Sequence, residues 1–220
     1  MMIKQKLKVW DLPTRIFHWC LLPAMIFMWY SAEQGGNWLV WHLRCGLFML
    51  ALLVFRISWG FWGSETARFK QFVKPTQIGR YLKGGLSENE QPGHNPLGAL
   101  MVLALIGALL FQVTTGLFAA DENTFLNSGY LNSLVSSDMG STLRGIHMAF
   151  FNVLLALIVV HVSTVLIYKF VKKHDLIKPM ITGYKELSGQ LPQLQFAGNK
   201  PLLVALAVAF FVVILVLTIG

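Results

Sequence analysis

The chain has 220 residues, of which 55% are hydrophobic and only 13% charged, so it is more apolar than an ordinary soluble domain. This composition predicts an all-α integral membrane protein whose main partner is the lipid bilayer. The formal net charge of +8 could indicate a nucleic-acid-binding protein, but with so few charges we attribute it to basic loops at one membrane surface and expect no nucleic acid.

Hydrophobic stretches divide the chain into five expected membrane helices. Each is close to the roughly 20 residues that cross a bilayer, and the first is expected to be retained, because no cleavable signal pattern precedes it. The expected helices are residues 14–32, 38–60, 96–119, 142–169 and 201–219. We expect residues 1–185 to form one membrane domain of four helices, and residues 186–220 to add a linker and a fifth helix.

The basic residues predict the orientation of the helices in the membrane. Sixteen of the eighteen lysines and arginines fall in the N-terminal flank and in the second and fourth connections with their flanks, which puts them on one side. The first and third connections contain none, and hold Glu33, Asp121, Glu122 and Asp138. Because basic loops stay in the cytoplasm, we expect a cytoplasmic N-terminus and a C-terminus on the outer side.

The second connection mixes hydrophobic and basic residues. Pro75 is suited to begin a short helix, which Gly84 and Gly85 would end, and such a segment would lie on the cytoplasmic membrane surface. The alternative is a plain solvated loop. The two cysteines, Cys20 and Cys45, form neither CxxC nor CxxCH, so they exclude a c-type haem attachment and are expected to pack in helices.

In this topology, four histidines are expected at two depths in the membrane, two at each depth. His147 and His161 lie fourteen residues apart in the fourth helix, about 21 Å along its axis and on one face. His18 is expected at the inner depth and His42 at the outer one, which gives the pairs His18 with His161 and His42 with His147. Facing helices with such pairs can ligate haem iron from both axial positions, whereas zinc usually needs three or four ligands at one depth. The alternative is histidines that only hydrogen-bond across a bundle.

Other residues could support two haem groups. Arg15, Arg44 and Arg144 lie near the histidine depths and could pair with haem propionates, or they could be interfacial charges. Glycines could let a flat macrocycle approach a helix, or could be helix-packing positions. These glycines are Gly46, Gly98, Gly107 and Gly116. The loop residue His174 is expected to be solvated.

Several blocks of sequence resemble the bacterial cytochrome b561 family and the related b-type cytochrome subunits of nickel–iron hydrogenases and formate dehydrogenase. The resemblance covers about Val9 to Lys185. Its blocks are VWDLPTRIFHW, WHLRCGLFMLALLVFRISWGFWG, PGHNPLGA, GIHMAFFNVLLALIVVHV and MITGYK. It implies a four-helix bundle with two non-covalent, bis-histidine b haems in the bacterial inner membrane, exchanging electrons between the quinone pool and a periplasmic c-type cytochrome or oxidoreductase subunit. The fifth hydrophobic stretch departs from the family's four-helix core.

A quinone site is expected beside the inner haem. His94 and Asn95 precede the third helix, whose first backbone N–H groups could donate to a quinone carbonyl, and related formate dehydrogenase subunits have their quinone near an asparagine in this connection. The alternative is that Asn95 only caps the helix, with Pro96 at its first position.

The sequence is also compatible with two other functions. A superoxide:ubiquinone oxidoreductase of the same fold would use Arg44 and Arg144, although the acidic outer connections offer no cationic funnel for an anion. The second alternative function is a membrane anchor whose histidines bind no metal or cofactor. We therefore expect an electron-transfer subunit of a respiratory oxidoreductase rather than a stand-alone enzyme.

Overall fold

The computed structural model describes residues 4–87, 89–121 and 127–220. Glu122, one of the acidic residues of the third connection, lies outside these ranges. The chain divides into two compact units. Unit 1 consists of Met1–Phe17, Arg56–Ala104 and Val159–Ala205, and unit 2 consists of His18–Phe55, Leu105–Ile158 and Leu206–Gly220. The expected boundary between residues 185 and 186 stays a prediction.

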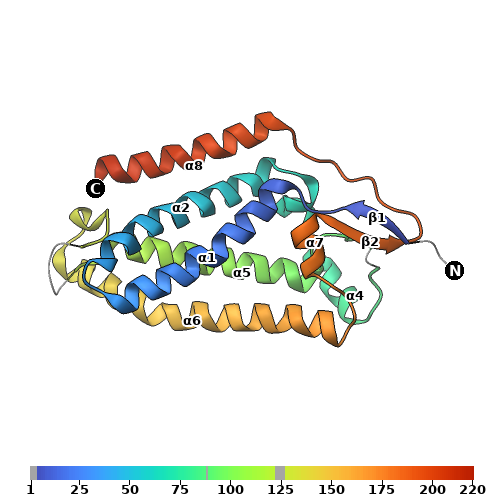
Figure 1. Cartoon of the computed structure of the whole chain (residues 1–220), viewed down its shortest axis with the longest axis horizontal. Coiled ribbons are helices and arrows are strands. Elements are labelled where there is room, and N and C mark those ends of the chain that lie inside the picture. The colour runs from blue at the N-terminus through green and yellow to red at the C-terminus, as the bar shows by residue number, and fades with distance from the viewer. Residues whose placement is uncertain (1–3, 88, 122–126) are drawn as a thin grey trace. The chain divides into compact units, whose positions relative to one another are not determined.

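Five of the described helices are long (Figure 1), and each contributes residues to both units. All five hydrophobic stretches are helical, within a few residues of the predicted ends. The helices are α1 (Leu12–Gln34), α2 (Trp38–Trp62), α5 (Pro96–Phe118), α6 (Ser137–Phe170) and α8 (Asn199–Ile219).

Four of the described helices are long and apolar enough to cross a membrane, namely α2, α5, α6 and α8. The all-α membrane class is thereby confirmed. Helix α1 is 23 residues long, like α5, but it is outside this set. Its arginine, histidine, glutamate and glutamine side chains lower its hydropathy.

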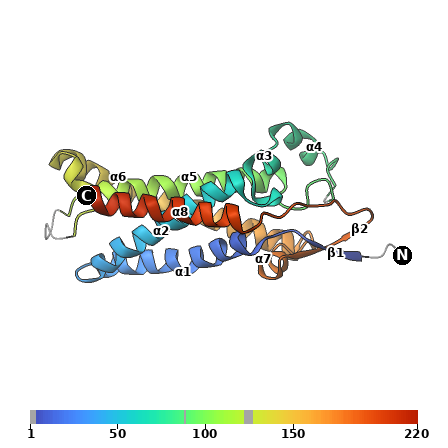
Figure 2. The same ribbon diagram turned by 90° about the horizontal axis from the view of Figure 1, so that it is seen from above.

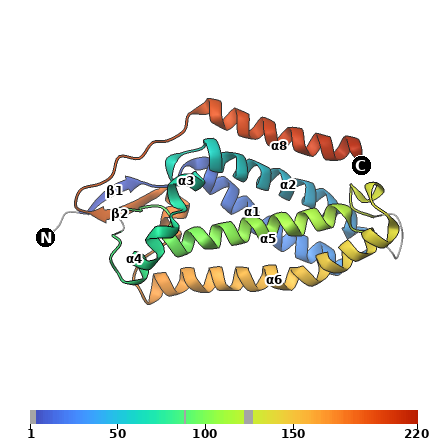
Figure 3. The same cartoon turned by 180° about the vertical axis from the view of Figure 1, so that it is seen from behind.

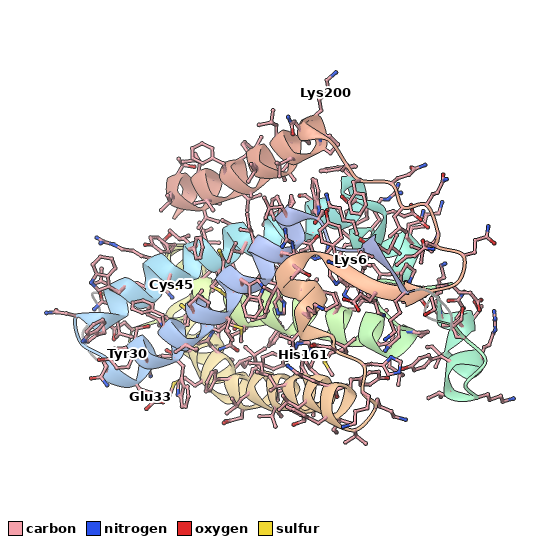
Figure 4. All side chains as sticks on the ribbon, turned by 45° about the vertical axis from the view of Figure 1, so that its right-hand side comes forward. Lys6, Tyr30, Glu33, Cys45, His161 and Lys200 are labelled. Atoms are coloured by element: carbon pink, nitrogen blue, oxygen red, sulfur yellow. The ribbon has the colours of Figure 1, made fainter. Side chains whose placement is uncertain are left out.

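A small antiparallel sheet accompanies the helices and was not predicted. Strand β1 (Lys4–Lys8) pairs with β2 (Tyr184–Ser188), and Lys6 lies opposite Glu186. The sheet belongs to unit 1, and Lys6 is labelled in Figure 4. The basic flank that fixes the predicted orientation is therefore an ordered strand.

Unit 1 holds a buried polar cluster at the start of α1. Asp11 is 5% exposed; its carboxylate accepts a 2.8 Å hydrogen bond from the Thr14 backbone N–H and another of 2.8 Å from Trp59 Nε1. Asp11 thus caps α1 and ties it to α2.

Gly183, at φ +87°, ends the short helix α7 (Ile177–Thr182), and its carbonyl accepts from the Trp10 N–H. A Cβ there would meet the Trp10 carbonyl at 2.9 Å, so both the turn and this close approach require glycine.

The second connection of the chain is a series of short helices, and it includes the one predicted to begin at Pro75. These elements are a 3₁₀ turn (Glu65–Ala67), α3 (Phe69–Phe72), a 3₁₀ turn (Pro75–Gln77) and α4 (Ile78–Leu82). Pro75 begins the second 3₁₀ turn, which α4 continues, and Gly84 follows α4 at φ +74°. The plain-loop alternative is wrong for this segment, while its place on a membrane surface stays a prediction.

Unit 2 contains a hydrophobic core to which all five long helices contribute. Leu53 of α2 is fully buried, and Ala24, Leu109, Leu154 and Val216 supply residues from the other helices. Gly35 and Gly36, at φ +60° and +53°, form the tight α1–α2 turn visible in Figure 2. A 3₁₀ turn (Asn132–Leu134) precedes α6.

Candidate functional site

Two of the predicted histidines meet in unit 2. His42 lies in the second turn of α2 and His147 in the third turn of α6. Their ring centroids are 6.2 Å apart, and the ring planes are nearly perpendicular, at 84°. The structure thus brings the expected outer pair together.

The His42 ring is held by α1. Its Nδ1 lies 2.9 Å from the Met28 carbonyl oxygen and 3.3 Å from the hydroxyl of Ser31, which is fully buried. Because a carbonyl oxygen can only accept, Nδ1 carries the proton and donates it, and Nε2 keeps the lone pair that a metal needs. The Ser31 hydroxyl in turn donates to the Phe27 carbonyl at 2.7 Å, which fixes its position.

The His147 ring is held by α5 in the same way. Its Nδ1 donates to the Gln112 carbonyl at 2.9 Å and lies 3.2 Å from the Thr115 hydroxyl. The Gln112 side-chain amide donates back to the His147 carbonyl at 2.9 Å, so α5 and α6 are linked in both directions. These helices run side by side in Figures 1 and 3.

Gly116 allows this close approach. A Cβ at Gly116 would lie 2.8 Å from Cε1 and 3.1 Å from Nδ1 of His147, closer than real side chains pack. Of the other predicted glycines, Gly107 has no atom within 4 Å of an added Cβ, and an added Cβ at Gly46 meets the Met28 methyl group at 3.9 Å. Gly116 therefore has a defined role in placing the histidine.

The outer pair fits a metal bound between two imidazoles. A metal–nitrogen bond is about 2 Å long, and the ring centre lies about 1 Å behind the nitrogen, so two ligands on opposite sides of one ion would have centres about 6 Å apart. The 6.2 Å separation agrees with this. Among the described residues, no group of three or more His, Cys, Asp and Glu side chains is placed to hold a metal ion.

Comparison with known proteins decides the family. The sequence pattern of the family described as prokaryotic cytochrome b561 matches residues 9–183, most of the chain. The chain belongs to the prokaryotic cytochrome b561 family. It is also 25% identical, over 215 residues, to a probable Ni/Fe-hydrogenase B-type cytochrome subunit of Rhizobium leguminosarum bv. viciae, covering 82% of this chain and 89% of that protein. No solved structure matches the chain.

Membership of this family makes the chain a membrane-bound b-type cytochrome that binds haem and transfers electrons. Among the described residues, His42 and His147 lie close enough that their two imidazoles could hold the haem iron between them. The hydroxyl groups of Ser31 and Thr115, which orient these rings, were missed by the sequence analysis. A Ser or Thr within an otherwise apolar helix, near the depth expected of a histidine, is the sequence signal that could have found them.

The inner histidines of this cytochrome belong to different units. His18 is in unit 2, on the second turn of α1, with its ring edge-on to Trp19 at 5.5 Å. His161 is in unit 1, on α6, and is labelled in Figure 4. Their pairing stays a prediction.

Three arginines were candidates for haem propionates. The Arg44 guanidinium lies over the Trp41 ring, 4.9 Å from its centroid, and Arg144 lies three residues before His147 on α6. Arg15 donates from Nη1 to the Ile181 carbonyl, within unit 1. Their role toward haem stays a prediction.

The expected quinone residues lie in unit 1, directly before the start of α5. Asn95 Oδ1 accepts a 2.7 Å hydrogen bond from the Gly98 backbone N–H, and Pro96 is the first helical residue, so the predicted capping geometry is present. Asn95 Nδ2 also donates to the Tyr168 hydroxyl at 3.4 Å. The His94 ring lies against Trp10 and Phe72, each with a centroid distance of 4.7 Å.

Proposed function

We propose that this chain is the di-haem b-type cytochrome subunit of a respiratory oxidoreductase, carrying electrons between the quinone pool and a periplasmic redox partner. His42 and His147 would hold the outer haem, and His18 and His161 the inner one. The observation that carries the proposal is the 6.2 Å separation of the outer imidazoles, each with its Nδ1 proton directed to a backbone carbonyl.

The protein residues prepare this site for electron transfer rather than for catalysis at the metal. Haem iron, when bound, supplies a one-electron carrier. His42 and His147 would hold the iron between their two imidazoles, and would then leave no coordination position there for oxygen or a substrate. Hydrogen bonds from Nδ1 to Met28 and Gln112 keep each ring in one tautomer and one orientation, which limits rearrangement of the ligands when the charge changes.

The division of charge supports the proposed topology. All sixteen basic residues predicted to be cytoplasmic belong to unit 1, whereas Arg44 and Arg144 belong to unit 2 together with Glu33, Asp121 and Asp138. We therefore propose five spans in the bacterial inner membrane, with α1 as the first, a cytoplasmic N-terminus and a periplasmic C-terminus. Interfacial rings of Trp29, Tyr30, Trp38 and Trp41 at the α1–α2 turn suit the outer boundary.

The similar Rhizobium protein supports a subunit role. It is named as a probable B-type cytochrome subunit of a Ni/Fe-hydrogenase, and the chain covers 89% of its length. We infer a periplasmic partner of the same general kind, either an oxidoreductase subunit or a c-type cytochrome.

A quinone site at His94 and Asn95 completes the proposal. The Asn95 side chain contacts the Tyr168 hydroxyl as well as capping α5. Asn95 directly precedes α5 and Tyr168 lies near the end of α6, and each of these helices is long enough to span the membrane. If quinone binds there, His94→Gln should slow haem reduction by quinol and leave the haem spectrum unchanged. Asn95→Ser keeps a capping oxygen but loses the amide, so a quinol rate equal to the parent's would favour the cap as its single role.

Haem counting on purified protein tests the main proposal. We expect two haem groups per chain, loss of one spectral component in His42→Ala and His147→Ala, and loss of the other in His18→Ala and His161→Ala. Loss of the same component in His18→Ala and His147→Ala would refute the pairing. A membrane anchor would show no haem in the parent, and rapid quinone-dependent consumption of superoxide would favour the superoxide oxidoreductase instead.

A further inference from the structure

Helix α6 is packed on one side within unit 2. The Phe150 ring lies 4.5 Å from the Phe111 ring of α5, measured between centroids. The Phe151 ring lies 6.3 Å from the Trp29 ring of α1, and Leu154 belongs to the hydrophobic core. Two of the 34 residues of α6, all of which are described, are buried. The chain thus covers one side of this helix and leaves the other exposed.

The exposed side of α6 carries a carboxamide group. Asn152 is exposed and, at 100° per residue, lies about 160° around the helix from Leu154. Its neighbours Val153 and Val159 are 49% and 56% exposed. At 1.5 Å per residue, Asn152 is about 5 Å from the middle of the apolar stretch 142–169. In a membrane, this amide therefore faces the hydrocarbon core.

Hydrocarbon offers the Asn152 amide no hydrogen bond. A carboxamide has two N–H donors and an oxygen acceptor. The described chain gives it one hydrogen bond, from Nδ2 to the Ala149 carbonyl of its own helix, and at 3.4 Å this bond is long.

Thr164 is a contrast on the same helix. It is also exposed, but its hydroxyl donates to the Val160 carbonyl at 2.7 Å and is satisfied within α6. The Asn152 amide has more donors and acceptors than its own helix can satisfy, and its side chain is too short to reach the headgroups from this depth. Asn152 therefore requires a polar group from outside the chain.

Small residues flank Asn152 on the exposed side. Ala149 and Ala156 lie about one turn before and after it, and both are exposed. Small side chains let the backbones of two membrane helices approach closely, and a close approach is what a short amide needs in order to reach its partner.

A second copy of α6 supplies a matching group at the matching depth. An amide is both donor and acceptor, so two of them related by a two-fold axis can exchange a pair of hydrogen bonds. Every copy of the chain enters the membrane with the same orientation, so Asn152 lies at the same depth in each. A helix of another protein would have to present a polar group at that depth independently.

We propose that two copies of this chain associate through α6, with Asn152 of each copy hydrogen-bonded to Asn152 of the other. His147 lies about 140° around α6 from Asn152, so the pairing leaves the contacts of His147 with α5 intact. The inference rests on α6 spanning a membrane and does not rest on the proposed electron-transfer function.

The test uses the full-length, haem-loaded protein in vesicles of phosphatidylethanolamine and phosphatidylglycerol. A fluorescent label attached after Gly220 allows copies to be counted by photobleaching steps, and a series of lipid dilutions gives the dissociation constant of the pair. The variants are Asn152→Leu, Asn152→Gln and Ala156→Ile.

Two substitutions are matched controls. Thr164→Val removes a polar group from the exposed surface of α6 that is satisfied by its own helix. Ala207→Ile enlarges an exposed alanine as Ala156→Ile does, but on α8. Haem content is measured on every variant to show that it is folded.

We expect Asn152→Leu to weaken pairing about 10–100-fold, the effect of losing two interhelical hydrogen bonds. Asn152→Gln should weaken it less, because it keeps the amide. Ala156→Ile should weaken pairing by holding the helices apart, whereas Thr164→Val and Ala207→Ile should pair like the parent.

The inference is overturned if the parent occurs as single copies at every dilution, which would leave Asn152 to a helix of another protein. It is also overturned if Asn152→Leu pairs like the parent, or if Ala207→Ile weakens pairing as much as Ala156→Ile. If Asn152→Leu fails to fold, parent-like pairing of Ala156→Ile overturns it.

Discussion

Gly116→Ala should selectively damage the outer haem site. An added Cβ would lie 2.8 Å from His147 Cε1, whereas ordinary contact begins at 3.4 Å, so the ring must withdraw by about 0.6 Å. Metal sites tolerate ligand displacements of about 0.2 Å. Overpacking costs about 1–3 kcal/mol, and alanine recovers about 0.5–1 kcal/mol over glycine in a helix. The net loss is at most about 2.5 kcal/mol, which corresponds to at most about 60-fold weaker binding at this site.

The assay is haem content together with a potentiometric titration of each spectral component. We expect Gly116→Ala to lose or shift the component assigned to His42 and His147, and to keep the other. Gly145→Ala is the matched control: it also lies on a spanning helix, its added Cβ meets no atom within 4 Å, and it points about 200° away from His147 around α6. Two unchanged components in Gly116→Ala, or an equal loss in Gly145→Ala, would refute the argument.

Three further tests, by substitution or by fusion, address separate parts of the structure. Ser31→Ala and Thr115→Val each remove one acceptor of a histidine Nδ1 proton, so the imidazole becomes a less basic ligand. The reduction potential of the outer haem should therefore rise in a redox titration. A lower potential would contradict the assigned tautomer. Asp11→Ala breaks the bond from Trp59 and the α1 cap and should cost about 1–3 kcal/mol in thermal unfolding, with Asp11→Asn retaining more stability. A periplasmic reporter fused after Gly220 should be active, and activity of a cytoplasmic reporter there would contradict five spans.

Hydrophobic length predicted the helices well but not their full extent. Helix α6 was expected from Thr142 and begins at Ser137, where the Ser136 hydroxyl accepts from the Met139 N–H at 3.3 Å. Hydropathy marks the part of a helix that lipid can cover, whereas the hydrogen-bonding pattern begins at a polar cap outside it. The first turn of α6 is polar, so a prediction based on hydrophobic residues did not include it.

The β-sheet could not be predicted from local sequence. Its strands are five residues each and are separated in the sequence by α1, α2, α5 and α6, so their pairing depends on where these helices bring the two segments. Lys4, Lys6 and Lys8 read simply as a basic flank. Their alternation with Gln5 and Leu7 is too short to distinguish a strand from a tail.

The meeting of His42 and His147, in contrast, was predicted from their places near the starts of two helices expected to begin on the same side, and their ring centroids lie 6.2 Å apart. What sequence could not supply was which helix holds each ring. The structure shows one arrangement used twice: a histidine Nδ1 donates to the carbonyl of residue i and lies beside the hydroxyl of residue i+3 on a neighbouring helix, Met28 and Ser31 of α1 for His42, Gln112 and Thr115 of α5 for His147. In an apolar helix the hydroxyl bonds back to its own carbonyls, so it adds no unsatisfied group to the membrane interior. A Ser or Thr is therefore inexpensive to place there, and two helices could acquire the same support for a metal ligand independently.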